Sequence, residues 1–72
     1  MYFVVFNLEL SCMVTAFGPP YTEKDVISYV DSINQREGNR YSYFCVSDDI
    51  PFSVVYEEIQ QNALDWKMEY GL

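Results

Sequence analysis

YFVVFNLELSCMVTAF, residues 2–17, decides how this 72-residue chain folds. Every even position in the stretch is apolar, from Tyr2 to Ala16, and several odd positions are polar, including Asn7. Alternation with period two is typical of a strand with one buried face. Sixteen residues at about 3.3 Å each would extend roughly 50 Å, which is too long for so small a domain. The stretch is therefore predicted to be one strand bent by a bulge, or two strands that fold back near residues 9–11.

The next segment carries the start and stop signals of a helix. Proline at positions 19 and 20 ends the strand region, because proline has no backbone N–H for a ladder. Thr22 is suited to the N-cap, and Asp25 lies three residues further on, close to the capping-box pattern. Gly38 supplies a left-handed stop. These signals predict a helix over 22–37, with an apolar stripe formed by Val26, Val30 and Ile33.

The second half of the chain repeats the pattern of strand and helix. Residues 40–47 are rich in aromatic and β-branched side chains, which predicts a strand buried on both faces. Residues 48–51, Asp-Asp-Ile-Pro, break this strand. Ser53 is a plausible cap for a second helix that runs to about Tyr70. At about 100° per residue, its apolar face comprises Val55, Tyr56, Ile59, Ala63, Trp66 and Tyr70.

This order of elements predicts a small α+β fold. A chain of 72 residues is expected to form a single domain over residues 1–72. Its architecture should be one sheet of two or three strands packed by two helices, in the order β(β)αβα. The strand–helix–strand unit favours parallel neighbours with right-handed passage. If residues 2–17 form a hairpin, both helices are expected on one face of the sheet, and the open edges of the sheet invite pairing with another chain.

Charge and composition exclude several classes of protein. Eleven acidic residues face four basic ones, there is no histidine, and the net charge is −7. Seven Tyr, five Phe and one Trp distinguish the chain from disordered acidic tails. The negative charge predicts that the protein does not bind nucleic acid directly, because phosphate is repelled. Without a basic leader or an apolar run of about 18 residues, we expect a soluble cytoplasmic protein that does not enter a membrane.

The chain contains no motif for catalysis, a cofactor or a metal. Cys12 and Cys45 have no histidine to activate them, so neither is expected to be a nucleophile. We expect two unpaired, partly buried thiols, with a Cys12–Cys45 disulfide as the alternative. The four carboxylates between residues 48 and 58 match no calcium-loop spacing. A turn at the strand end followed by a helix N-terminus, where the helix dipole favours carboxylates, accounts for them. The sequence thus predicts a protein that is not an enzyme and needs no cofactor or metal.

The excess of acidic residues is the feature of the sequence that says most about function. In size, charge and lack of catalytic residues, the chain resembles small acidic proteins that imitate nucleic acid, many of them phage-encoded anti-CRISPR and anti-restriction inhibitors of host defence. The resemblance is one of type. It implies a phage or mobile-element inhibitor that occludes a basic, nucleic-acid-binding site on a host protein. The alternative is a small regulatory or structural subunit that self-associates, for example as a homodimer, or that docks through a sheet edge.

The second predicted helix presents the expected partner-binding surface. On one continuous helix, Glu58, Asp65 and Glu69 would project within about 40° of one another, at roughly 100° per residue. Such a cluster repels itself, so a basic partner explains it better than solubility alone. Leu64 and Met68, which lie four positions apart, would form the apolar centre of this patch. The predicted partner-binding residues are Asp48, Asp49, Glu57, Glu58, Leu64, Asp65, Met68 and Glu69.

Overall fold

The first two strands form an antiparallel hairpin. The computed structural model describes residues 1–47 and 49–72, and within them β1 (Tyr2–Asn7) pairs with β2 (Cys12–Phe17). The Asn7 side chain forms the turn, because its Oδ1 accepts hydrogen bonds from the backbone N–H groups of Glu9 and Leu10, both at 3.0 Å. Asparagine commonly stabilises turns in this way. The hairpin alternative predicted for residues 2–17 is therefore confirmed.

A β-bulge in β2 interrupts the period-two pattern. Val5 pairs with Thr15 and Phe6 pairs with Met13, so Val14 has no partner across the ladder. A bulge of one residue reverses the facing of the side chains beyond it. Met13 accordingly packs against the same core as Ala16, and Val14 is 40% exposed. The prediction that all even positions share one buried face was wrong for this reason, and Cys12 is exposed as well.

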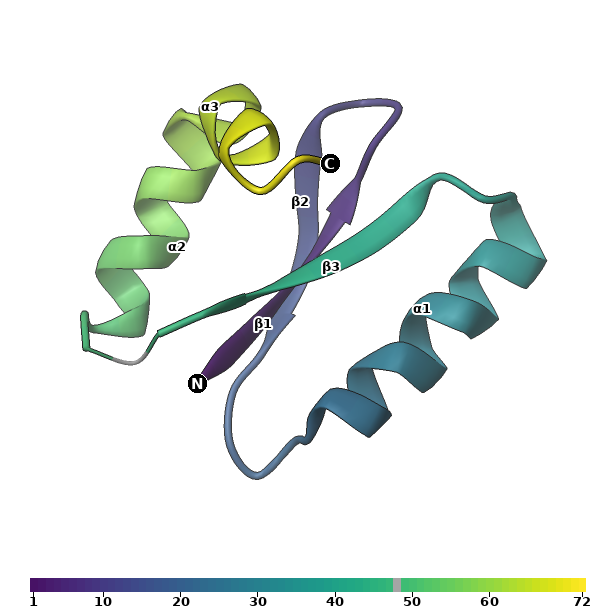
Figure 1. Ribbon diagram of the computed structural model, residues 1–72, viewed down its shortest axis with the longest axis horizontal. Helices are drawn as coiled ribbons and strands as arrows, with labels where there is room; N and C mark the ends of the chain where they lie inside the picture. The colour runs from purple at the N-terminus through teal and green to yellow at the C-terminus, as the bar shows by residue number, and fades with distance from the viewer. Residues whose placement is uncertain (48) are drawn as a thin grey trace.

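The sheet has the strand order β2-β1-β3 (Figure 1). Strand β3 (Tyr41–Val46) pairs antiparallel with β1, and α1 (Glu23–Glu37) connects β2 to β3. The parallel neighbours expected across this helix are therefore separated by β1. The capping box between Thr22 and Asp25 is present, and Gly38 ends α1 with φ = 103°, both as predicted. The observed architecture confirms the α+β fold class.

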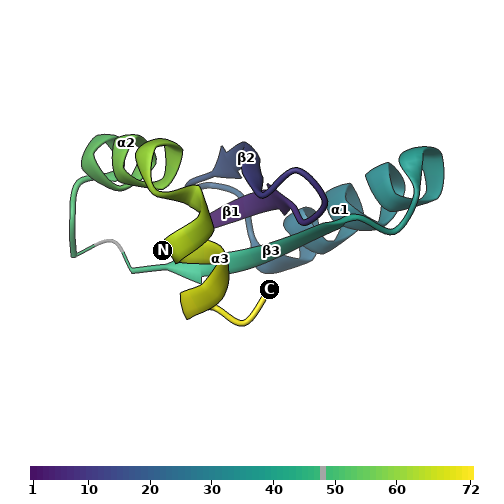
Figure 2. The ribbon, with the colours of Figure 1, turned by 90° about the horizontal axis from the view of Figure 1, so that it is seen from above.

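The helices cover opposite faces of the sheet (Figures 1 and 2). Helix α1 packs Val26 and Val30 against Phe3 and Val5 of β1. Helix α2 (Phe52–Gln61) covers the other face, where its buried residues join a cluster comprising Val4, Phe6, Phe44, Val46, Val55 and Ile59. The expectation of two helices on one face was wrong, because β1 has bulky apolar side chains on both of its faces and each face needs cover.

The predicted helix over residues 53–70 is two helices. It begins at Phe52, after an N-cap at Pro51 rather than Ser53, and α2 ends at Gln61. Asn62 leaves the helical conformation, with φ = −127° and ψ = 41°, and α3 (Ala63–Glu69) then runs in a new direction (Figure 1). Asparagine is a weak helix former, which makes it a suitable place for the break.

A lysine adds polar contacts between α3 and the hairpin. The Lys67 ammonium donates hydrogen bonds to the carbonyl oxygen of Leu8 at 2.9 Å and to Ser11 Oγ at 3.1 Å. Ser11 has φ = 53°, so the turn itself presents this hydroxyl. The contact joins residues that are far apart in the sequence, and it holds the end of α3 against the sheet.

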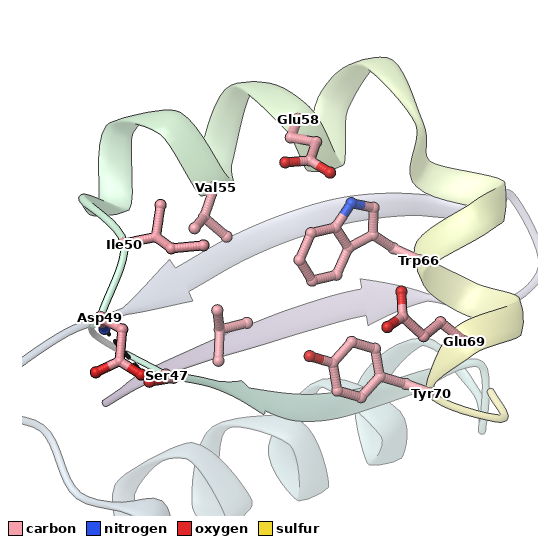
Figure 3. A pocket seen from close by; sticks show the side chains of 9 residues that line it. Ser47, Asp49, Ile50, Val55, Glu58, Trp66, Glu69 and Tyr70 are labelled. Atoms are coloured by element: carbon pink, nitrogen blue, oxygen red, sulfur yellow. Dashed lines mark hydrogen bonds between the residues drawn. The ribbon is translucent and has the colours of Figure 1, made fainter.

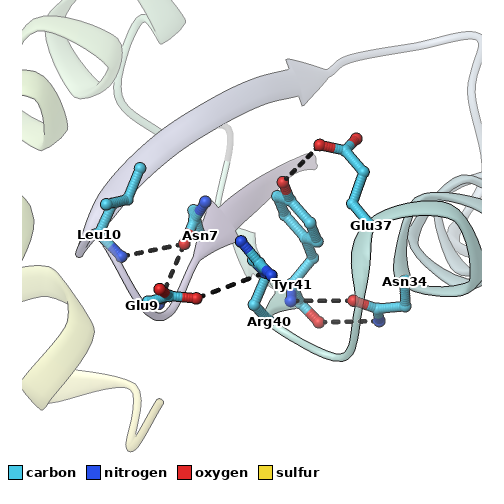
Figure 4. Close-up of polar contacts among 7 residues, drawn as sticks. All are labelled: Asn7, Glu9, Leu10, Asn34, Glu37, Arg40 and Tyr41. Atoms are coloured by element: carbon cyan, nitrogen blue, oxygen red, sulfur yellow. Dashed lines mark hydrogen bonds and ion pairs between the residues drawn. The ribbon is translucent and has the colours of Figure 1, made fainter.

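Strand β3 is also tied to α1 through an asparagine (Figure 4). The Asn34 amide donates to the carbonyl oxygen of Tyr41 at 3.1 Å and accepts from the Tyr41 N–H at 3.0 Å. Asn34 thus occupies the place that a further strand would take at this end of β3. Glu37 accepts a hydrogen bond from the Tyr41 hydroxyl at 3.3 Å, and Arg40 pairs with Glu9 at 3.4 Å across the neighbouring turn.

We expect Asn34→Ala to lower the free energy of unfolding by about 1–2 kcal/mol, because two backbone groups of Tyr41 lose their partner. Gln35→Ala is the matched control, since Gln35 is exposed on the same helix and alanine is the better helix former. Urea denaturation followed by circular dichroism measures both changes. Equal stability of the two variants would contradict a structural role for the Asn34 contact.

Candidate protein-binding groove

A groove of about 340 Å³ lies where the end of β3, the approach to α2 and the face of α3 meet (Figure 3). It opens on the side of the sheet that α2 and α3 cover. Its lining includes apolar and aromatic side chains and three carboxylates. The lining residues are Val46, Ser47, Asp49, Ile50, Val55, Glu58, Trp66, Glu69 and Tyr70.

Stacked aromatic rings form one wall of the groove. The rings of Trp66 and Tyr70 are almost parallel, with an interplanar angle of 8° and centroids 5.7 Å apart. Both stack on Phe44 of β3, at 6.0 Å and 4.4 Å respectively. Phe44 is buried, Trp66 is half-buried and Tyr70 is 40% exposed, so the cluster leads from the core to the surface. Helix α3 can place these rings here because it turns away from α2 at Asn62.

Carboxylates surround this aromatic wall. Figure 3 shows Glu58 on one side of the Trp66 indole and Glu69 on the other, between Trp66 and Tyr70, with Asp49 at the far end of the groove. All three acidic residues are exposed. Across residues 1–47 and 49–72, neither Glu58 nor Glu69 has a side-chain hydrogen bond or ion pair. Their charges are therefore not neutralised within this part of the chain.

The basic side chains are used elsewhere or lie on another part of the molecule. Arg36 pairs with Glu37, Arg40 pairs with Glu9, and Lys67 binds the hairpin turn. Lys24 is exposed on α1, which packs on the opposite face of the sheet. The electrostatic potential of the groove is therefore expected to be negative, because no cation lines it.

Three of the eight predicted partner-binding residues meet in the groove, namely Asp49, Glu58 and Glu69. The predicted cluster of Glu58, Asp65 and Glu69 on one helix face was wrong, because the break at Asn62 places these residues on two helices of different direction. Four of the other predicted residues are exposed and do not line the groove, and Asp48 lies outside the described residues. These four are Glu57, Leu64, Asp65 and Met68.

The apolar pair predicted for the centre of the patch is separate from the groove. Leu64 is 58% exposed and Met68 is 71% exposed, on the side of α3 away from Trp66. The aromatic side chains that line the groove together with Glu58 and Glu69 are Trp66 and Tyr70, which the sequence assigned to the buried face of a single helix. Recognising Asn62 as a helix end would have been the signal for this change, because it divides the apolar face in two.

Both cysteines are free thiols, as predicted, although Cys12 is exposed rather than partly buried. In the part of the chain that the structure describes, no three Cys, Asp or Glu side chains are gathered closely enough to hold a metal ion. No described helix has the length and apolar character needed to cross a membrane.

Truncation of the groove wall should destabilise the protein moderately. Trp66→Ala is expected to lower the free energy of unfolding by about 2–3 kcal/mol, less than for a fully buried aromatic, because Trp66 is partly exposed. Met68→Ala on the same helix is the control and should change stability by less than about 0.5 kcal/mol. Urea titration with circular dichroism measures both. A Trp66→Ala variant as stable as the wild type would mean that the ring stack contributes nothing to folding.

Alkaline pH should weaken the fold. Burial raises the pKa of Tyr70 above its usual 10.0, and Glu69 adds to this effect. Burial likewise raises the pKa of Cys45 above its usual 9.0, with a further contribution from Glu23. Above those ordinary values the unfolded chain loses protons that the folded chain still holds. The contribution of these two groups to the free energy of unfolding is therefore fully present below pH 9.0 and is lost as the pH rises. Melting temperatures measured from about pH 8 to about pH 11 should decline, and less steeply for Tyr70→Phe. A flat profile would contradict the pKa shifts.

Comparison with known proteins adds no further assignment. No protein-family model, curated protein or solved structure matches the chain. The geometry and charge of the groove are therefore the observations that bear on function.

Proposed function

We propose that this protein is a non-enzymatic binding module that docks its acidic groove onto a basic surface of another protein. One observation carries the proposal: Glu58 and Glu69, without a cation partner in the described chain, flank the half-buried ring of Trp66. Partner surfaces of this composition are typical of protein interfaces, where aromatic residues form the centre and charged groups form the rim.

The distribution of charge along the chain favours the same surface. Residues 49–72, which include α2 and α3, contain five acidic residues and one basic residue. That basic residue, Lys67, is bound to the hairpin turn. A surface of one sign accelerates the approach of a partner of opposite sign, and the apolar contact made after docking slows release.

In its specific form, the proposal is a phage or mobile-element inhibitor of anti-CRISPR or anti-restriction type. It would act in the cytoplasm of the host cell by occluding the nucleic-acid-binding site of a host protein. The resemblance to such inhibitors in size, charge and lack of catalytic residues supports this reading. Because a surface that binds nucleic acid is basic, carboxylates around an aromatic wall are complementary to it.

The alternative, self-association or docking through a sheet edge, has less in its favour. The bulge at Val14 distorts the outer edge of β2, and Asn34 already binds the backbone of Tyr41 at one end of β3. Bulges and covered edges are features that limit edge-to-edge pairing. The groove is therefore the better candidate for the partner-binding surface.

The test compares two double variants that remove the same charge. Glu58→Gln with Glu69→Gln neutralises the groove, and Glu57→Gln with Asp65→Asn neutralises the same helices outside it. The tagged wild-type protein is used to isolate a partner from lysates of bacteria that carry CRISPR or restriction systems, and association rates are then measured over a range of salt concentrations. The groove variant should associate several-fold more slowly, with a flatter salt dependence, than the control variant.

Competition with nucleic acid tests the mode of action. A double-stranded oligonucleotide should displace the protein from its partner, while the protein itself should not retain the oligonucleotide at physiological salt. A partner that binds both at once would contradict occlusion. Equal effects of the two double variants would contradict the groove as the docking site.

A further inference from the structure

We propose that the groove receives an arginine side chain from the partner, with the guanidinium stacked on Trp66 between Glu58 and Glu69. This inference rests on the proposed function, because it names the chemical group on the basic surface that the groove would recognise. It is more specific, because a negative groove alone would accept lysine equally well.

The parallel rings favour a planar cation. Trp66 and Tyr70 deviate from parallel by only 8°, and Phe44 lies within 21° of both. A guanidinium is flat and can extend such a stack, whereas a compact ammonium group is best held by rings that surround it at steep angles. Phe44 is buried, whereas Trp66 is half-buried and Tyr70 is 40% exposed, so the ring cluster reaches the surface through Trp66 and Tyr70.

The carboxylates lie where the edges of a stacked guanidinium would be. Figure 3 shows Glu58 and Glu69 on opposite sides of the indole, each carried by a different helix. Arginine presents five N–H donors in one plane and can therefore bind two carboxylates while it stacks. Lysine has no flat face and concentrates its donors at one point.

The dimensions of the groove agree with a side chain as occupant. Its volume of about 340 Å³ is close to the lower end of the range for small-ligand sites, about 300–1,000 Å³. One long side chain fits such a space, and a helix or strand of the partner would remain outside it. The apolar residues Val55 and Ile50 would contact the aliphatic stem, which arginine commonly buries while its head group stays polar.

The only tryptophan in the chain reports directly on this groove. Wild-type protein is titrated with a tetra-arginine peptide and, separately, with a tetra-lysine peptide of equal charge. Calorimetry gives the affinities, and tryptophan fluorescence locates the binding. We expect the arginine peptide to bind several-fold more tightly and to alter the fluorescence more strongly.

Two near-isosteric variants provide the matched comparison. Glu58→Gln should weaken binding of the arginine peptide several-fold, and Glu57→Gln, the same change at the next position outside the groove, should have little effect. Equal affinity for the two peptides would overturn the arginine inference and leave the proposed docking function standing. Failure of the wild type to bind either peptide would overturn both, and equal losses in the two variants would overturn the groove as the site.

Discussion

The central position of β1 is the constraint on which the rest of the structure depends. Both of its edges are paired, with β2 and with β3, and both of its faces are buried from Phe3 to Asn7. One layer of helices can cover only one face of such a strand. It requires α1 on one side and α2 on the other, and it leaves α3 to cover the end of the sheet beside Phe44.

The groove is a result of how α2 and α3 share the cover of one face of the sheet. Helix α2 buries Val55 and Ile59 in the core. The chain then changes direction, and α3 contributes a half-buried tryptophan. Because α3 has no fully buried residue, its aromatic side chains lie at the boundary between core and solvent. Lys67 holds this short helix in place through the hairpin turn, so the only basic residue in 49–72 serves the fold and the carboxylates remain unbalanced.

Local signals in the sequence predicted local structure well. The capping box at Thr22, the stop at Gly38 and the aromatic strand before residue 48 are determined by neighbouring residues, and each was confirmed. The expected burial of that strand on both faces was confirmed only in part, because Phe44 and Val46 alone are fully buried in β3. The placement of the helices on two faces was not predictable in the same way, because it depends on how β1 is paired. The groove was found only in part: charge patterning indicated Asp49, Glu58 and Glu69, but the break at Asn62 decided which residues surround them.

The strand order also has a consequence for the speed of folding. Strand β1 can pair with β2 across a short turn, but its second partner, represented by the Val4–Phe44 pair, lies about 40 residues further along the chain. Closing so long a loop has an entropic cost that must be met before the contacts it allows are formed. Until β3 arrives, one edge of the most apolar strand in the protein remains open. Helix α1, which has its own cap and stop, shortens the effective distance by ordering much of the intervening chain, so its early formation should determine how briefly that edge is exposed.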